Sequence, residues 1–237
     1  MLRSLVGSEM CIRDSTIVAT LSIMVLTSNL SSAIIIATIP AIMILVVGVP
    51  KKFVKQAIFL VALAAIPMGA YLTLHGDGFR LNRISVWLNP EDNAADGGFQ
   101  VLQGLYAIGS GGLFGAGLGE SKQKYLYLSE PHNDFIFSII AEELGFVGCI
   151  LVFVLFAVFI WRGVLIAMKA PDMFGSLVAV GITSLVGVQA IINVAVVTSS
   201  MPVTGMQLPF FSYGGTALFI LLCEVGVLLS ISRAGNK

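Results

Sequence analysis

The sequence contains few charged residues and few cysteines. Asp, Glu, Lys and Arg make up 11% of its 237 residues, and 13 basic and 13 acidic side chains give a formal net charge of zero. A chain without a basic excess lacks the electrostatic footprint of a nucleic-acid-binding protein. Cys149 and Cys223 lie in apolar runs and Cys11 in an atypical head, so exported loops have no disulfide framework. Serine-hydrolase, metalloprotease and zinc-site signatures are missing as well, so the sequence does not support those classes.

Hydrophobic residues are what the chain has in excess. They make up 57% of the sequence, and the mean hydropathy is +0.97. Several apolar runs are long enough to cross the hydrocarbon core of a bilayer, about 30 Å thick, and none shows the period of two typical of a membrane β-barrel. The sequence therefore predicts an all-α polytopic membrane protein. We expect six spans, at about residues 16–28, 31–49, 53–74, 134–161, 174–198 and 211–232.

The first 15 residues, MLRSLVGSEMCIRDS, do not resemble the start of a native membrane protein. They resemble a translated cloning adaptor, and they lack the continuous apolar core of a signal peptide. We therefore assign residues 1–15 to a non-native head and residues 16–237 to one transmembrane domain. Because this head does not look native, we expect the natural protein to continue upstream; the span that follows it, at 16–28, is short for a membrane span.

Lys and Arg residues near the ends of the spans predict the orientation in the membrane. Those that share one side, which we expect to be cytoplasmic together with the C-terminus, are Lys51, Lys52, Lys55, Arg162, Lys169, Arg233 and Lys237. The long loop 75–133 and the short loop 199–210 then face outward. Because prolines break the helical pattern within 198–216, we expect this segment to be buried in protein or to line a cavity beside 120–134.

Glycines crowd the second half of the long outer loop. Residues 99–118 are apolar again, which predicts an amphipathic or re-entrant helix at the outer leaflet. Six glycines between positions 109 and 119 match neither the dinucleotide-binding pattern nor the P-loop pattern. They either let the backbone turn and pack closely, or they hold a ligand phosphate with backbone N–H groups.

Charged residues gather immediately before the fourth predicted span: Lys122, Lys124, Glu130, His132 and Asp134. In one interpretation, Asn133 or Asp134 is only the N-cap of that span. In the other, Asp134 is a general base that takes a proton from a sugar hydroxyl, and Lys122, Lys124 or Arg83 neutralises a departing diphosphate. Glu130, His132 and Asp134 could also hold a divalent cation, although their spacing is not diagnostic and we assign no metal site.

Three acidic residues fall inside predicted spans, Glu142 and Glu143 in the fourth and Glu224 in the sixth. A charge at membrane depth needs a partner or a wet cavity. These carboxylates are therefore either buried against helix N-termini and hydroxyl groups or part of a proton relay.

These motifs resemble the SEDS family (shape, elongation, division and sporulation), above all its FtsW/SpoVE branch. The family's R-x-x-R-I…NP pattern is found at 80–84 and 89–90, and its Q-x-x-Q pattern at 100–103. The glycine motif is found at 107–119, the P-E-x-H-[TN]-D-F-I-F motif at 129–137 and the closing P-V-T-G…S-Y-G-G-[ST] motif at 202–216. Ser129 replaces the usual proline, and the turn at 28–32 also lacks its proline. The sequence SKQK at 121–124 resembles the division and sporulation branch rather than the RodA branch.

The resemblance implies a SEDS-type helical bundle in which this chain holds about six of roughly ten spans. It implies a peptidoglycan glycosyltransferase that polymerises lipid II in the bacterial plasma membrane, with Asp134 at the essential acidic position. The residues implied to bind the substrate are Arg83, Gln103, Lys122, Lys124, Glu130, His132 and Ser212. The implied partners are a class B penicillin-binding protein, which is a transpeptidase, and other divisome or sporulation proteins.

Two other functions stay open. One is a lipid II flippase, in which the intramembrane glutamates would couple transport to protons. The other is a non-catalytic scaffold of a division complex. A flippase needs a polar path through the full membrane, whereas the polar residues of this chain gather on the side predicted to be outside.

Overall fold

The computed structural model describes residues 25, 30–47, 78–93, 97–126 and 131–235. All regular structure in this part of the chain is α-helical, in agreement with the predicted fold class. Three helices are long and apolar enough to cross a membrane: α7 (Ile136–Lys169), α8 (Met173–Val197) and α9 (Gly215–Ala234). A shorter apolar helix, α2 (Leu30–Val47), occupies the second predicted span. Apart from residue 25, the predicted head and the spans at 16–28 and 53–74 lie outside the described residues.

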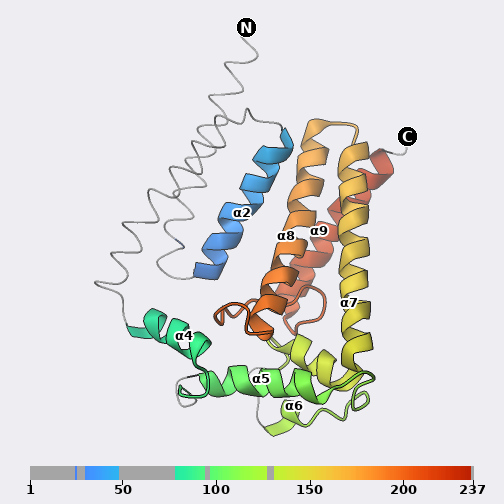
Figure 1. Ribbon diagram of the computed structural model, residues 1–237. Helices are drawn as coiled ribbons and strands as arrows, with labels where there is room; N and C mark the ends of the chain where they lie inside the picture. Colours follow the sequence, from blue (N-terminus) through green and yellow to red (C-terminus); the bar gives the residue numbers. More distant parts are fainter. Residues whose placement is uncertain (1–24, 26–29, 48–77, 94–96, 127–130, 236–237) are drawn as a thin grey trace.

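The helices form two layers (Figure 1). The helices α2, α7, α8 and α9 run side by side, and α4 (Gly78–Leu88), α5 (Gly98–Ser110) and α6 (Gln123–Leu126) lie across one end of this bundle. Within the most apolar window of each span, 50% of α8 is buried, against 22% of α7 and 11% of α9. The central helix is therefore α8, and two of its polar residues, Thr183 and Asn193, are buried.

The main hydrophobic core lies between α7, α8 and the loop that precedes α9. Its buried members include Phe135, Phe137, Val186, Val197 and Leu208. Because Phe135 is 1% and Leu208 1% exposed, the two irregular segments that contain them are packed into the protein rather than left at its surface. This packing confirms the expectation that the proline-broken segment is enclosed by protein.

The helix α7 is longer than predicted. It runs to Lys169 instead of ending near residue 161, so Arg162 and Lys169 lie inside the helix and not in a loop. The helix continues because the sequence is apolar from residue 161 through residue 168 except for Arg162 and Gly163, and it contains no proline before Pro171. The following helix α8 begins at once, where the Asp172 carboxylate accepts a hydrogen bond from the Gly175 N–H at 2.9 Å.

The helix α5 is shorter than predicted. It begins at Gly98, close to the expected residue 99, but ends at Ser110 instead of continuing to 118. The residues that follow include Gly112, Gly115 and Gly117 with φ of 57°, 78° and 112°, and a right-handed helix cannot continue through such angles. The amphipathic helix is thus replaced in its second half by a glycine-rich loop, which we define as residues 111–119.

Candidate functional site

The glycine-rich loop packs against an interruption in α7. Gly145 has φ 66° and ψ −162° inside that helix, so the local helical hydrogen bonds are broken. The loop supplies the missing partners: Phe146 N–H donates to the Gly112 carbonyl (2.9 Å), and Gly117 N–H donates to the Glu143 carbonyl (3.0 Å). Loop and helix therefore complete each other's backbone hydrogen bonds.

Close packing is also visible from the space around the glycines. A Cβ atom added to Gly111 would lie 1.9 Å from the Ala141 carbonyl oxygen, and one added to Gly115 would lie 2.1 Å from the Glu143 carbonyl oxygen. Side chains at these two positions would push the loop off the helix. The close-packing interpretation of the glycines is therefore confirmed, and the N–H groups of Ala116 and Gly117 are bonded to α7 rather than directed at a ligand.

Glu142 anchors the segment that follows this loop. Its side chain is 4% exposed and accepts two hydrogen bonds, from the Ser121 hydroxyl (2.5 Å) and from the Lys122 backbone N–H (2.9 Å). Ser121 Oγ in turn accepts from the Lys124 backbone N–H at 3.2 Å. Hydrogen bonds to a carboxylate are among the stronger ones in proteins. Burial against a hydroxyl group, one of the two alternatives for Glu142, is what the structure shows.

The other two glutamates differ from Glu142. Glu143 is half-buried, and its Oε1 has no hydrogen-bond partner among the described residues. Glu224 is half-buried on α9. A proton relay through these residues stays a prediction.

The turn 131–135, which carries Asp134, is held by three successive backbone carbonyls. The His132 carbonyl accepts from the Tyr213 N–H (2.8 Å), and the Asn133 carbonyl accepts from the Ser212 hydroxyl (2.6 Å). The Asp134 carbonyl accepts from Asn193 Nδ2 of α8 at 2.8 Å. The sequence segments around 134 and 212 therefore lie side by side, as predicted.

The side chain of Asp134 is half-buried and points toward the loop before α9. A Cβ atom added to Gly205, whose φ is 69°, would lie 3.4 Å from Asp134 Oδ2. The prediction that Asn133 or Asp134 is the N-cap of α7 is wrong. The N-cap position is Phe135, one residue later than Asp134, and no side chain caps the helix there. The irregular turn extends one residue further than predicted, and this leaves Asp134 before the helix.

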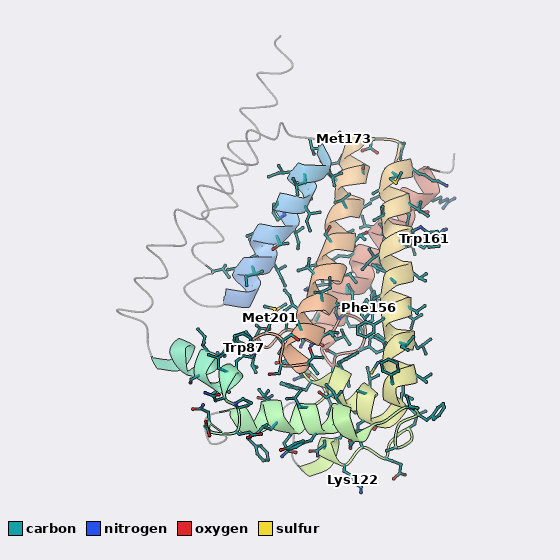
Figure 2. All side chains as sticks on the ribbon, viewed as in Figure 1. Trp87, Lys122, Phe156, Trp161, Met173 and Met201 are labelled. Carbon is teal, nitrogen blue, oxygen red and sulfur yellow. The ribbon has the colours of Figure 1, made fainter. Side chains whose placement is uncertain are left out.

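The helix α4 is tied to the same loop by two side chains. Arg83 Nη1 donates to the Val203 carbonyl (3.3 Å), and Trp87 Nε1 donates to the Ser199 carbonyl (2.8 Å). These residues are four positions apart and so share one face of the helix. Figure 2 shows Trp87 close to Met201, at the junction of the two layers.

A cavity of about 410 Å³ opens next to the turn. Its lining includes His132 and Ile136 from one side, and Phe210, Phe211 and Tyr213 from the other. Asp134 itself is not among the lining residues, although His132 and Ile136, two positions away on either side, line the cavity. The cavity is mostly aromatic and apolar, with His132 and Ser212 as polar groups, which is typical of a site for an amphiphilic ligand.

The structure brings some of the predicted site residues together and separates others. His132, Asp134 and Ser212 meet at the turn, and Arg83 reaches the adjoining loop. Lys122 is exposed and lies on the outer side of α5 in Figure 2, where its backbone is bonded to Glu142. Lys124 is half-buried beside it, and Gln103 is half-buried on α5.

No metal site is found in the described part of the chain. No group of three His, Cys, Asp or Glu side chains there could hold an ion. Glu130, the first member of the predicted cation trio, lies outside the described residues, so that trio stays a prediction.

Three residues that the sequence analysis did not single out contribute to the site: Ser121, Asn193 and Gly205. Asn193 had a usable signal, because it is a polar side chain within an apolar span and must find a partner. Gly205 follows a Pro-Val-Thr sequence, and nothing local shows that its backbone lies against a carboxylate.

The fold and the site define a helical integral membrane protein with a half-buried carboxylate in a turn beside an aromatic cavity, at one end of its spans. A family model described as cell cycle protein, which covers FtsW, RodA and SpoVE, matches residues 5–237, and the chain belongs to this family.

Named relatives agree with this membership. The chain is 56% identical over 155 residues to stage V sporulation protein E of Bacillus subtilis. This alignment covers 65% of this chain and 42% of that protein. It is 44% identical over 209 residues to a probable peptidoglycan glycosyltransferase FtsW of Trichlorobacter lovleyi. This second alignment covers 88% of this chain and 53% of that protein. The chain thus spans about half the length of these relatives.

Solved structures have the same fold. One, reported as "Structural coordination of polymerization and crosslinking by a peptidoglycan synthase complex", has 27% identity and a TM-score of 0.71 and covers 94% of this chain and 63% of that one. The rod shape determining protein RodA of Thermus thermophilus has 26% identity and a TM-score of 0.58 and covers 95% of this chain and 58% of that one.

Proposed function

We propose that the protein is a peptidoglycan glycosyltransferase that polymerises lipid II, the undecaprenyl-diphosphate-linked disaccharide-pentapeptide, during cell division or sporulation. The observation that carries the proposal is the half-buried Asp134, which lies in a turn held through three successive carbonyls. Its neighbours His132 and Ile136 line a cavity of about 410 Å³. The FtsW and SpoVE relatives support the reaction class and the two biological processes.

In the proposed reaction, Asp134 is the general base. Its carboxylate takes the proton of an acceptor-sugar hydroxyl, and the oxygen attacks the anomeric carbon of a second lipid II. The bond from that carbon to the diphosphate breaks, and the diphosphate leaves with the electron pair. Arg83, Lys122 and Lys124 stabilise the charge that develops on the diphosphate. Gln103, Glu130, His132 and Ser212 bind the remaining parts of the substrate.

The proposed setting is the outer face of the bacterial plasma membrane. The layer of α4, α5 and α6 then lies outside the cell, and the C-terminus lies in the cytoplasm, as the distribution of Lys and Arg favours. The proposed partner is a class B penicillin-binding protein with transpeptidase activity, alongside other division or sporulation proteins. The similarity to a chain of a peptidoglycan synthase complex supports a partnered enzyme.

The test is the Asp134→Asn variant of the full-length protein, assayed with purified lipid II and the cognate transpeptidase. Asparagine keeps the size of the side chain and the backbone hydrogen bonds of the turn but cannot accept a proton. We expect the rate of polymerisation to fall by about 100-fold or more. The matched control is Asp172→Asn, which changes a carboxylate that caps α8 to another good cap and should leave the rate unchanged. Polymerisation by Asp134→Asn at the wild-type rate would move the base elsewhere.

A further inference from the structure

Asn193 joins the central helix to the turn that carries Asp134. Its side chain is 1% exposed, and Nδ2 donates to the Asp134 carbonyl at 2.8 Å and to the Met206 carbonyl at 2.6 Å. One amide group thus fixes two irregular segments that are far apart in sequence. Both contacts start from α8, the helix with the largest buried share of the three spans.

The Oδ1 end of this amide differs from the Nδ2 end. Asn193 Oδ1 is buried and has no hydrogen-bond partner among the described residues. A buried acceptor without a partner costs about 1–3 kcal/mol, which offsets much of the gain from the two hydrogen bonds of Nδ2. A leucine of similar volume would remove this acceptor but would also leave the Asp134 and Met206 carbonyls without their donor from α8. The two hydrogen bonds to these carbonyls are therefore what the asparagine provides and an apolar side chain cannot.

The position of the carboxylate depends on these carbonyls. Ser212 and Tyr213 hold the carbonyls of residues 133 and 132, so Asn193 holds the third one, which belongs to Asp134 itself. Without this hydrogen bond, the peptide after Asp134 loses its donor from α8, so the backbone there can shift and carry the side chain with it. A displacement of about 1 Å in a reacting group can reduce a rate by about 100-fold.

We propose that Asn193 is a positioning residue that sets the orientation of Asp134 through its backbone carbonyl and holds the loop around Met206 in register with it. The inference rests on the proposed function, because orientation matters for the rate only if the Asp134 carboxylate takes part in the reaction. It concerns a side chain that does not line the cavity and need not touch the substrate.

The experiment compares Asn193→Leu and Asn193→Ser with wild-type full-length protein in the lipid II polymerisation assay. The matched control is Thr183→Val, since Thr183 is also a buried polar residue of α8, 4% exposed, and its Oγ1 has no hydrogen-bond partner among the described residues. The kcat value is expressed per molecule that binds fluorescent lipid II, so that loss of folded protein does not count as loss of rate. Hydrogen exchange of segments 131–135 and 203–214 is measured on the same samples.

We expect Asn193→Leu to lower kcat by about tenfold or more while KM changes less than about twofold. Exchange in both segments should become faster, and Thr183→Val should match wild type in every measurement. If Asn193→Leu does not fold, Asn193→Ser decides, because its shorter side chain cannot reach both carbonyls and should lower kcat in the same way. A wild-type kcat in the variant that folds overturns the inference.

The Asp134→Asn variant, run in parallel, separates this inference from the proposed function. If Asp134→Asn is inactive and the Asn193 variants keep the wild-type kcat, only the positioning role falls. If Asp134→Asn is fully active, the assignment of the base falls, and the positioning role falls with it.

Discussion

Gly115 and Gly145 face each other so closely that a Cβ atom on Gly145 would lie 2.3 Å from the backbone nitrogen of Gly115. Both have positive φ, 78° and 66°, so each is in a conformation that L side chains rarely adopt. This contact lets the glycine-rich loop enter the break in α7. The break in the helix and the glycines of the loop are one structural feature, and the first prediction concerns it.

Gly145→Ala and Gly115→Ala should destabilise the protein. Both positions have positive φ, and the φ and ψ of Gly145 (66° and −162°) lie in a region that essentially only glycine adopts. The added methyl group would also overlap backbone atoms of the facing segment. We expect the thermal unfolding midpoint in detergent to fall by about 5 °C or more. Gly109→Ala is the control, because Gly109 lies in α5 with open space around it, and alanine there should be neutral or stabilising. Equal midpoints for all three variants would contradict the close contact.

Glu142→Gln separates an anchoring role from a proton relay. Glutamine can still accept from the Lys122 N–H, so as an anchor it should keep most of the stability and most of the polymerising activity. Glu142→Ala should lose both hydrogen bonds and about 3 kcal/mol or more, since each bond to a charged group contributes about 1.5–3 kcal/mol. Unfolding midpoints and polymerisation rates are measured for both variants. The control is Glu143→Gln. The buried Oε1 of Glu143 has no hydrogen-bond partner among the described residues, so this substitution removes no such bond. Loss of activity in a stable Glu142→Gln variant would favour the relay.

Single cysteines test the orientation in the membrane. We replace Cys11, Cys149 and Cys223 and then place one cysteine at exposed Glu91 or exposed Ala234. An impermeant thiol reagent on intact cells should label position 91 and not 234, because the Lys and Arg distribution places the C-terminus inside. Labelling of both after permeabilisation is the control. The opposite pattern would place the candidate site in the cytoplasm.

Lys122→Gln and Lys124→Gln test whether these lysines act on the diphosphate. If they do, turnover in detergent without anionic lipid should fall by about tenfold or more, because fixed cations stabilise the charge of the leaving group. If they only bind anionic head groups, turnover should not change under these conditions. Lys169→Gln is the control, since Lys169 lies in the last turn of α7, at the other end of the bundle. Lys122 is exposed on the outer side of α5, so its assignment to the substrate site depends on this experiment.

The sequence predicted the helical class, the extent of α8 to within a residue and the meeting of the two irregular segments. These depend on apolar length and on proline, which are local properties. It did not predict the break at Gly145, because a single glycine in an apolar run is common and its φ is set by the loop that enters. It placed the start of α7 within two residues but missed its N-cap position, because the turn 131–135 is held by Asn193 and Tyr213, which are distant in sequence.

The sequence separation of these contacts implies an order in which they can form during synthesis. Glu142 and the glycine-rich loop are separated by about 25 residues, so they can pair as soon as the first half of α7 has left the ribosome. The groups that hold Asn133 and Asp134 come 79 and 59 residues later, from the final third of the chain. A nascent chain that stops before α8 therefore contains the carboxylate but none of the described bonds that orient it. Polymerising competence, on the proposed mechanism, arises only after α8 and the loop before α9 have been inserted.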